Sequence, residues 1–201
     1  MNPNILKSCT IIVRCHESWT WKEFTRIINK YDIVDTEQSE TGLYAEIPLE
    51  SAGAKVDIYT GKDKREKIFT VQKQQGIYKY DCNDASGDLI GRIEYRYYIG
   101  WFVSDKQQNI ICESKERKHR LRDLAGNLNG LTRSKVFYDI YVDKQIAGEI
   151  VDEFDASAPS RTNLSRYYSA HINNFGTKRI DRRLLIALIF SINSWNSYRI
   201  Y

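Results

Sequence analysis

The residues in this sequence best suited to chemistry are cations that occur in short clusters. Residues 115–122 read Lys-Glu-Arg-Lys-His-Arg-Leu-Arg, a run that gathers the cations Lys115, Arg117, Lys118, Arg120 and Arg122. A second cluster is Lys178, Arg179, Arg182 and Arg183, and a third is Lys62, Lys64, Arg65 and Lys67, interrupted by Asp63 and Glu66. Basic clusters of this kind bind phosphates or anionic lipid surfaces, or else form a solvated face.

Arg182 and Arg183 stand where a helix is expected to begin. The dipole of a helix disfavours cations at its amino-terminal end. These two arginines therefore need acidic partners, or a bound anion gathered by the backbone N–H groups of the first turn. We take Arg182 and Arg183, together with the cations of residues 115–122, as candidate residues for binding an anion or a lipid headgroup.

Residues for catalysis or metal binding are not evident. His16, His119 and His171 have no neighbour at the spacing that metal ligands require. The four cysteines (Cys9, Cys15, Cys82 and Cys112) form no C-x-x-C pair, and nucleophile-elbow, phosphate-loop and dinucleotide motifs are absent from the sequence. We therefore predict no enzymatic activity, no catalytic residues, no metal and no cofactor.

Composition sets the class of protein. The 201 residues carry 30 Lys plus Arg against 26 Asp plus Glu, a net charge of +4, and 42% are hydrophobic. These values are typical of one globular domain and exclude both a disordered chain and a polybasic tail. The first seven residues lack the apolar stretch of a secretory signal, and the longest apolar run, residues 184–190, is too short to span a bilayer. We expect a cytoplasmic protein, which peripheral binding could bring to a membrane.

The first 42 residues differ from the rest. A short strand is expected at Thr10–Arg14, and Thr20 with Glu23 forms a capping box before a stripe of apolar residues at helical spacing. The pattern predicts an amphipathic helix at Trp21–Tyr31. We therefore expect an extension over residues 1–42, whose helix packs on the main domain or docks a protein partner.

From residue 43 the hydrophobic pattern changes to a period of two, as in β-strands, and residues 43–201 are expected to form the barrel domain. The strands expected in the whole chain are Thr10–Arg14, Leu43–Leu49, Lys55–Tyr59, Lys67–Lys73, Ile77–Cys82, Leu89–Arg96, Ile99–Ser104, Asn109–Ser114, Lys135–Val142, Gln145–Val151 and Tyr167–Ile172. Turn residues separate many of them, which favours an antiparallel sandwich or barrel. A faint repeat places Gly91 and Gly148 inside equivalent strands, where each indicates a bend or the close approach of another backbone.

The carboxy-terminal segment decides between these architectures. Asp181 can cap a helix over about residues 181–195, and residues 184–192 are apolar on almost every side. Such a helix must be buried, and a sheet that encloses a helix about 10 Å across has to be a wide closed barrel. The fold expected is therefore mainly β, a closed antiparallel barrel of about eleven or twelve strands around a hydrophobic carboxy-terminal helix, with the amino-terminal helix added.

This arrangement resembles the tubby-like superfamily, which covers tubby carboxy-terminal domains, LURP-one-related proteins and phospholipid scramblases. The resemblance rests on Asp84-x-x-Gly87-x-x-Ile90-Gly91-x-Ile93, on Trp101-Phe-Val-x-Asp105, on Tyr138–Asp143 with Ile146-x-Gly148-Glu-Ile150, and on the helix from Asp181. It implies a twelve-stranded barrel around a hydrophobic helix. It also implies that basic side chains on the barrel hold a phosphoinositide headgroup, although no binding position is matched one by one.

Three functions follow as hypotheses. The first is a non-enzymatic tubby-like module that binds an anionic lipid headgroup, such as a phosphoinositide at a membrane surface, or a protein partner. The second is nucleic-acid binding, with residues 115–122 on the phosphates, although a net charge of +4 is modest for that role. The third is a structural or adaptor protein with no small ligand, whose partner docks on the Trp21–Tyr31 helix.

Overall fold

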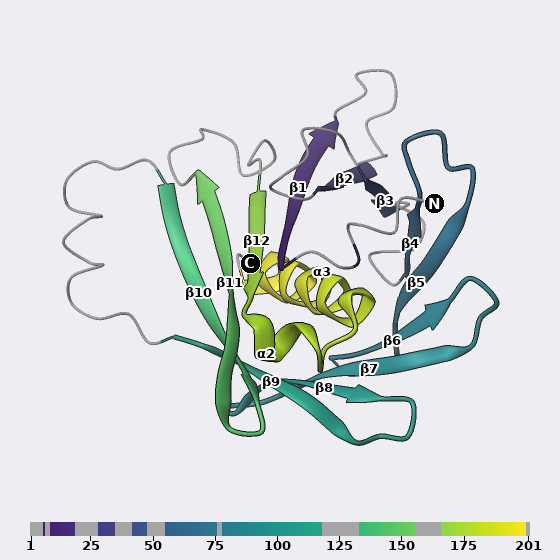
Figure 1. The fold of residues 1–201 in the computed structure, drawn as a ribbon. Helices are drawn as coiled ribbons and strands as arrows, with labels where there is room; N and C mark the ends of the chain where they lie inside the picture. The colour runs from purple at the N-terminus through teal and green to yellow at the C-terminus, as the bar shows by residue number, and fades with distance from the viewer. Residues whose placement is uncertain are drawn as a thin grey trace.

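The fold is a closed antiparallel β-barrel with a helix inside it. The computed structural model describes residues 6, 9–18, 28–34, 42–47, 55–75, 78–117, 133–155 and 166–199. Within these ranges, twelve strands close into one barrel in the order β1-β12-β11-β10-β9-β8-β7-β6-β5-β4-β3-β2. Each strand is therefore hydrogen-bonded to its neighbour in the sequence, and β1 to β12 closes the barrel (Figure 1).

The elements have the following bounds. The strands are β1 Thr10–Ser18, β2 Ile28–Val34, β3 Leu43–Ile47, β4 Lys55–Tyr59, β5 Lys67–Lys73, β6 Lys79–Asp84, β7 Leu89–Arg96, β8 Gly100–Asp105, β9 Ile110–Glu116, β10 Arg133–Val142, β11 Gln145–Asp155 and β12 Arg166–Ile172. The helices are α2 Asn174–Thr177 and α3 Arg182–Arg199. The closed barrel and the carboxy-terminal helix confirm the fold class predicted from the sequence.

Strand β2 corrects the prediction of an amphipathic helix at Trp21–Tyr31. Ile28–Val34 is extended and pairs with β1 on one side and β3 on the other. Tyr31 and Ile33 both point into the barrel and are fully buried. Long-range pairing thus overrides the local capping signal, because these side chains gain more burial in a strand than one helical stripe would provide. Residues 21–27 lie outside the described residues.

The same pairing places part of the expected extension over residues 1–42 in the barrel itself. Strands β1 and β2 both lie before residue 43, and both belong to the barrel wall. The barrel therefore comprises Thr10–Ser18 and Ile28–Val34 as well as the strands that follow. The hypothesis that a Trp21–Tyr31 helix docks a partner loses Ile28–Tyr31, and its remaining part falls on residues that the structure leaves undescribed.

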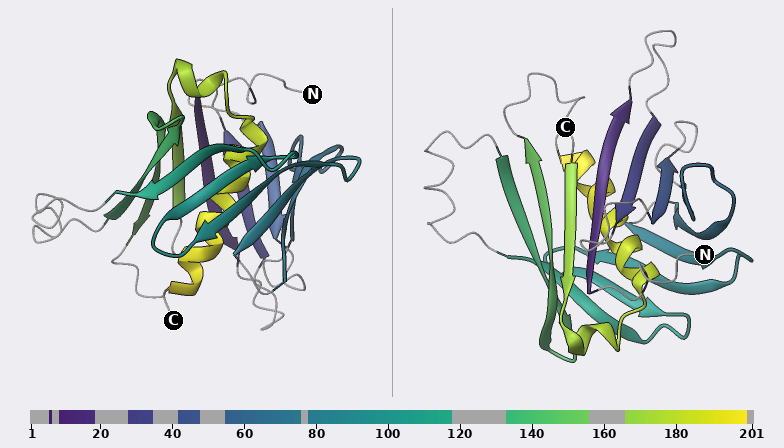
Figure 2. Two further views of the ribbon diagram at one scale, coloured as in Figure 1. Left: turned by 90° about the horizontal axis from the view of Figure 1, so that it is seen from below. Right: turned by 45° about the horizontal axis from the view of Figure 1, so that its top comes forward.

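Helix α3 fills the barrel. Figures 1 and 2 show it passing through the interior with strands on both sides. Every residue from Leu184 to Ile192 is at most 3% exposed, and the helix lies closest to β1 and β5–β8. Because α3 is apolar on all sides, it is stable only where protein surrounds it. This is the hub of the hydrophobic core.

One polar residue inside the barrel aligns α3 with the wall. The Asn193 side-chain amide donates to the Tyr31 hydroxyl at 2.8 Å and accepts from the Tyr168 hydroxyl at 3.0 Å. Tyr31 also packs edge-to-face on Phe190, with ring centroids 4.8 Å apart. Buried polar groups are costly unless they are hydrogen-bonded. These hydrogen bonds therefore favour one rotation of α3 about its axis and one position of α3 along the barrel interior.

The two glycines of the sequence repeat sit where backbones crowd. A Cβ on Gly91 would lie 2.3 Å from the Ser104 carbonyl oxygen and 3.0 Å from a methyl carbon of Leu184 in α3. A Cβ on Gly148 would lie 2.2 Å from the His171 carbonyl oxygen. In both hairpins the strand register shifts next to the glycine. The prediction of close backbone approach at both positions is confirmed.

Candidate functional site

The end of the barrel where α3 begins holds a partly open cavity of about 820 Å³, which we call the mouth. It is formed by Leu6, the start of β5, the β6–β7 turn and the segment from α2 into α3. Its lining residues are Leu6, Glu66, Lys67, Ile68, Ala85, Thr177, Lys178, Arg179, Ile180, Asp181, Arg182 and Arg183. The mouth thus brings Lys67 of the third basic cluster beside the whole second cluster.

Asp181 takes the position that an anion would occupy at the start of α3. Its carboxylate accepts a hydrogen bond from the Arg183 backbone N–H at 2.9 Å and pairs with the Arg183 guanidinium at 2.6 Å. Burial opposes ionisation, but the hydrogen bonds from Arg183 outweigh it and hold the pKa of Asp181 below its ordinary value. Arg183 therefore has an acidic partner, one of the two alternatives left open by the sequence.

Arg182 is unusual because its guanidinium is buried. The residue is 4% exposed, and one terminal nitrogen donates to the Ile180 carbonyl oxygen at 3.4 Å. Burial lowers the pKa of Arg182 below that of a free arginine. Arg182 thus lines the mouth as a buried cation.

The remaining cations of the mouth carry its excess charge. Lys67 and Lys178 make no ion pair among the described residues, and Arg179 has only a long one, 3.7 Å to Asp143. The lining holds five cations (Lys67, Lys178, Arg179, Arg182, Arg183) against two carboxylates (Glu66, Asp181). The mouth is therefore positive, and its exposed lysines are available to a ligand.

The described part of the 115–122 run does not line the mouth, and its charges are paired. Arg117 holds Asp139 of β10 through several hydrogen bonds, and it reaches Glu149 of β11 at 3.0 Å. These carboxylates raise the pKa of Arg117 above its already high value, with Asp139 the larger contributor. Lys115 pairs with Glu113 at 3.0 Å. Arg117 thus clamps three strands together.

The other predicted residues of this run cannot be placed. Lys118, Arg120 and Arg122 lie outside the described residues. The structure therefore separates the predicted site residues that it describes into two groups, of which only one lines the mouth. Arg182 and Arg183 line the mouth, whereas Lys115 and Arg117 stand at the far end of β9.

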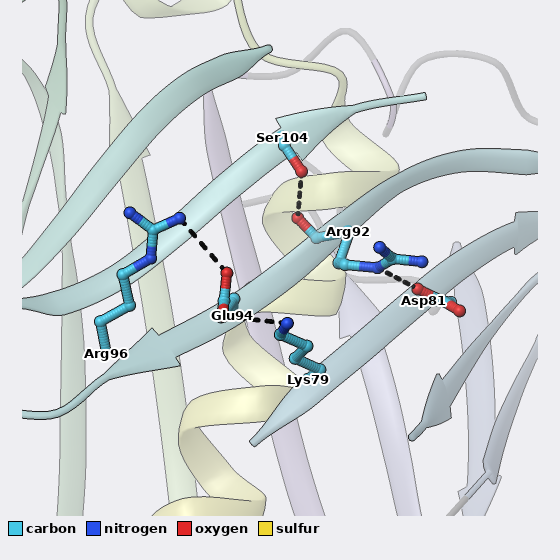
Figure 3. Close-up of polar contacts among 6 residues, drawn as sticks. All are labelled: Lys79, Asp81, Arg92, Glu94, Arg96 and Ser104. Carbon is cyan, nitrogen blue, oxygen red and sulfur yellow. Dashed lines mark hydrogen bonds and ion pairs between the residues drawn. The ribbon is translucent and has the colours of Figure 1, made fainter. Parts of the chain in front are cut away.

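The rest of the third cluster is neutralised. Lys62 pairs with Asp32 at 3.1 Å, Lys64 with Glu46 at 2.6 Å, and Arg65 with Asp63 at 2.6 Å. The wall of β6 and β7 is similar. Figure 3 shows its charged side chains paired with one another, beside Ser104. Its contacts are Arg92–Asp81 at 2.7 Å, Lys79–Glu94 at 3.2 Å and Arg96–Glu94 at 3.4 Å. Because the cations of both surfaces are paired with carboxylates, these surfaces have little net positive charge for binding an anion.

Two cysteine thiols of the barrel are expected to be unreactive. Cys82 and Cys112 are buried, and desolvation raises the pKa of each to about 12. Neither carries the thiolate that a nucleophile needs at neutral pH. Over the residues described, no group of three or more His, Cys, Asp and Glu side chains is placed to hold a metal ion. Nor does any described helix have the length and apolar character needed to cross a membrane.

Arg182 and Arg183 were predicted as site residues from the sequence, whereas Lys67, Lys178 and Arg179 were not. All three belong to basic clusters that were recognised. Their common position was missed because residue 67 and residues 178–183 are more than a hundred positions apart. Only the closure of the barrel, with α3 entering at the start of β5, makes them neighbours.

Comparison with known proteins adds one structural neighbour. No family model matches the sequence, and no curated protein matches it. Among solved structures, the chain is similar to the X-ray structure of a protein from Arabidopsis thaliana. The TM-score is 0.49 and the sequence identity 9%, over 92% of this chain and 91% of that one.

Proposed function

We propose that this chain is a non-enzymatic tubby-like barrel that binds a phosphorylated anion at its mouth. The ligand is the headgroup of an anionic lipid, such as a phosphoinositide, or the same phosphate group in solution. The proposal is supported by the architecture, since a twelve-stranded barrel around an apolar carboxy-terminal helix is what the resemblance to tubby-like proteins implies.

One observation carries the choice of ligand. Cations from two distant parts of the sequence line a single cavity, with five cations against two carboxylates. Phosphate groups are bound in proteins by clustered lysines and arginines, and a cavity focuses their field. The volume of about 820 Å³ is within the range of small-molecule sites.

Reversal of two exposed charges tests the proposal. Lys67→Glu combined with Lys178→Glu leaves the Asp181–Arg183 pair and the barrel wall in place. At about 1 kcal/mol for each basic residue, we expect affinity for inositol trisphosphate, measured by calorimetry, to fall about thirtyfold or more. Flotation with phosphatidylinositol bisphosphate vesicles, run in parallel, separates the lipid from the soluble ligand.

Lys106→Glu is the matched control. Lys106 is exposed in the β8–β9 turn and does not line the mouth, so its reversal should leave binding close to wild type. Wild-type protein that does not bind inositol trisphosphate at low salt, or a double variant that binds it as tightly as the wild type does, would refute the proposal. Nucleic-acid binding through residues 115–122 and an adaptor role stay predictions from the sequence.

A further inference from the structure

The turn between β7 and β8 exposes three consecutive large apolar residues, which we call the apex. Tyr97 is 65% exposed, Tyr98 94% and Ile99 53%. Four other turns are described over their full length, at residues 60–66, 85–88, 106–109 and 143–144. None of these four carries a large apolar side chain. The apex therefore differs in kind from the other turns of this barrel.

Turn geometry does not explain the residues of the apex. The Ile99 backbone N–H donates to the Arg96 carbonyl oxygen at 3.0 Å, which makes Tyr98 the third residue of a four-residue turn. Tyr98 has φ of 64°, in the left-handed region where glycine or asparagine is favoured. A bulky side chain in a strained conformation, nearly all of it in water, contributes little to folding. Lys64, Gln108, Asp143 and Lys144 in the other turns also have positive φ. What distinguishes Tyr98 is its large ring, which is nearly all exposed to water and so has no evident role in the fold.

A chain of aromatic contacts leads from the apex back to the core. Tyr98 packs edge-to-face on Tyr97 with ring centroids 4.6 Å apart, and Tyr97 packs on Tyr95 at 6.3 Å. Tyr95 in turn lies 5.1 Å from buried Trp101. The exposed rings are thus in contact with one another and, through Tyr95, with the core.

Cations border the apex. Arg96 ends β7 and lies over the Phe102 ring at 4.3 Å, and Lys73 ends β5 and lies over the Tyr78 ring at 5.6 Å. Lys115 lies on β9, beside the Gly100 end of β8. Arg96 also pairs with Glu94, and Lys115 pairs with Glu113. Exposed ion pairs are weak, so these cations can contact lipid headgroups as well. Exposed tyrosine rings beside them suit the interface of a bilayer, where aromatic rings take the headgroup level.

We infer that the apex is a membrane anchor that inserts into the surface of a bilayer containing anionic lipid. The exposed area of the three side chains is roughly 400 Å², about half of the ~800 Å² that each partner contributes to a stable protein interface. A bilayer needs no complementary pocket, so a protruding turn of this size suffices. This anchor lies at the end of β7, whereas the mouth borders the start of that strand.

Flotation with vesicles of phosphatidylcholine and phosphatidylserine tests the anchor. Tyr97→Ser combined with Tyr98→Asn removes both rings, and asparagine suits the φ of residue 98, so the melting temperature should not fall. We expect flotation to weaken at least about fivefold, because binding scales with the apolar area buried in the interface. Ile146→Ser is the control, since Ile146 is 60% exposed in the hairpin that Asn173 and α2 join near the mouth.

A second measurement reports which end touches the lipid. Tyr98→Trp should show blue-shifted emission and quenching by brominated acyl chains, relative to the wild-type background, whereas Ile146→Trp should not. The inference is overturned if wild-type protein does not float, if the double variant floats as the wild type does, or if Ile146→Trp is quenched and Tyr98→Trp is not. The mouth variants play no part in these readouts, so failure here is distinct from failure of the proposed function.

Discussion

Asp181 shows how one side chain can satisfy the start of a buried helix. Its carboxylate caps the backbone at Arg183 and neutralises the Arg183 guanidinium. It also offsets the unfavourable placement of two arginines at the positive end of the α3 dipole. Because the carboxylate is ionised more readily in the folded protein than in the unfolded chain, folding and protonation are linked.

That linkage predicts a pH-dependent effect of Asp181→Asn. The pKa of Asp181 is lowered on folding, so its stabilisation is complete above the unfolded value of about 3.9 and disappears as pH falls through the lower folded value. We expect the variant to be less stable than the wild type at pH 7 by about 1–2 kcal/mol. The gap should narrow steadily below pH ~4.

Urea unfolding at several pH values measures this gap. Asparagine keeps the capping oxygen, so the comparison isolates the charge. A gap of constant size from neutral to acid pH would mean that the carboxylate acts through shape alone.

Among the elements, the barrel strands show what local pattern can predict. Strands β4, β5 and β7 have the bounds expected from alternation and turn residues, and α3 begins one residue after its predicted start. These signals are local, since side-chain period and turn chemistry depend on neighbours in the sequence. Strand β2 was missed because its stability comes from pairing with β1 and β3, while a capping box before it favoured a helix.

The candidate functional residues also divide into those that local sequence signals reveal and those that depend on long-range contacts. Arg182 and Arg183 could be identified because a helix start makes cations conspicuous. The position of Lys67 beside them depends on the closure of the barrel, which local pattern does not encode. The apex was missed since Tyr97 and Tyr98 continue the aromatic pattern of the strands, and their exposure appears only once the turn is located.

The enclosure of α3 makes a strong prediction about Ile189. This side chain is fully buried, so Ile189→Asp places a charge inside the barrel and should cost several kcal/mol, enough to unfold a domain of ordinary stability. Circular dichroism melting measures the effect. Ile146→Asp introduces the same charge at an exposed position of β11 and should melt near the wild-type temperature. A stable Ile189→Asp variant would contradict the enclosed helix.

At the scale of the whole molecule, the barrel separates a charged site, the mouth, from an apolar site, the apex. The mouth lies where β7 begins and the apex where it ends, and eight residues of strand span roughly 26 Å. The Debye length at physiological ionic strength is about 8 Å. Charges in the mouth are therefore screened from a bilayer at the apex.

This separation predicts that the two sites act independently at about 0.15 M salt. Lys67→Glu with Lys178→Glu should leave flotation on phosphatidylserine vesicles unchanged, and Tyr97→Ser with Tyr98→Asn should leave affinity for inositol trisphosphate unchanged. The variant with all four substitutions should lose both flotation and affinity for inositol trisphosphate, each by the amount seen in the corresponding double variant. At about 0.01 M salt the Debye length grows to about 30 Å, which exceeds the span of β7, so the mouth reversals should begin to weaken flotation. Coupling at 0.15 M would instead require that both ends contact one surface, because screened charges at opposite ends of the barrel have no other means of interaction.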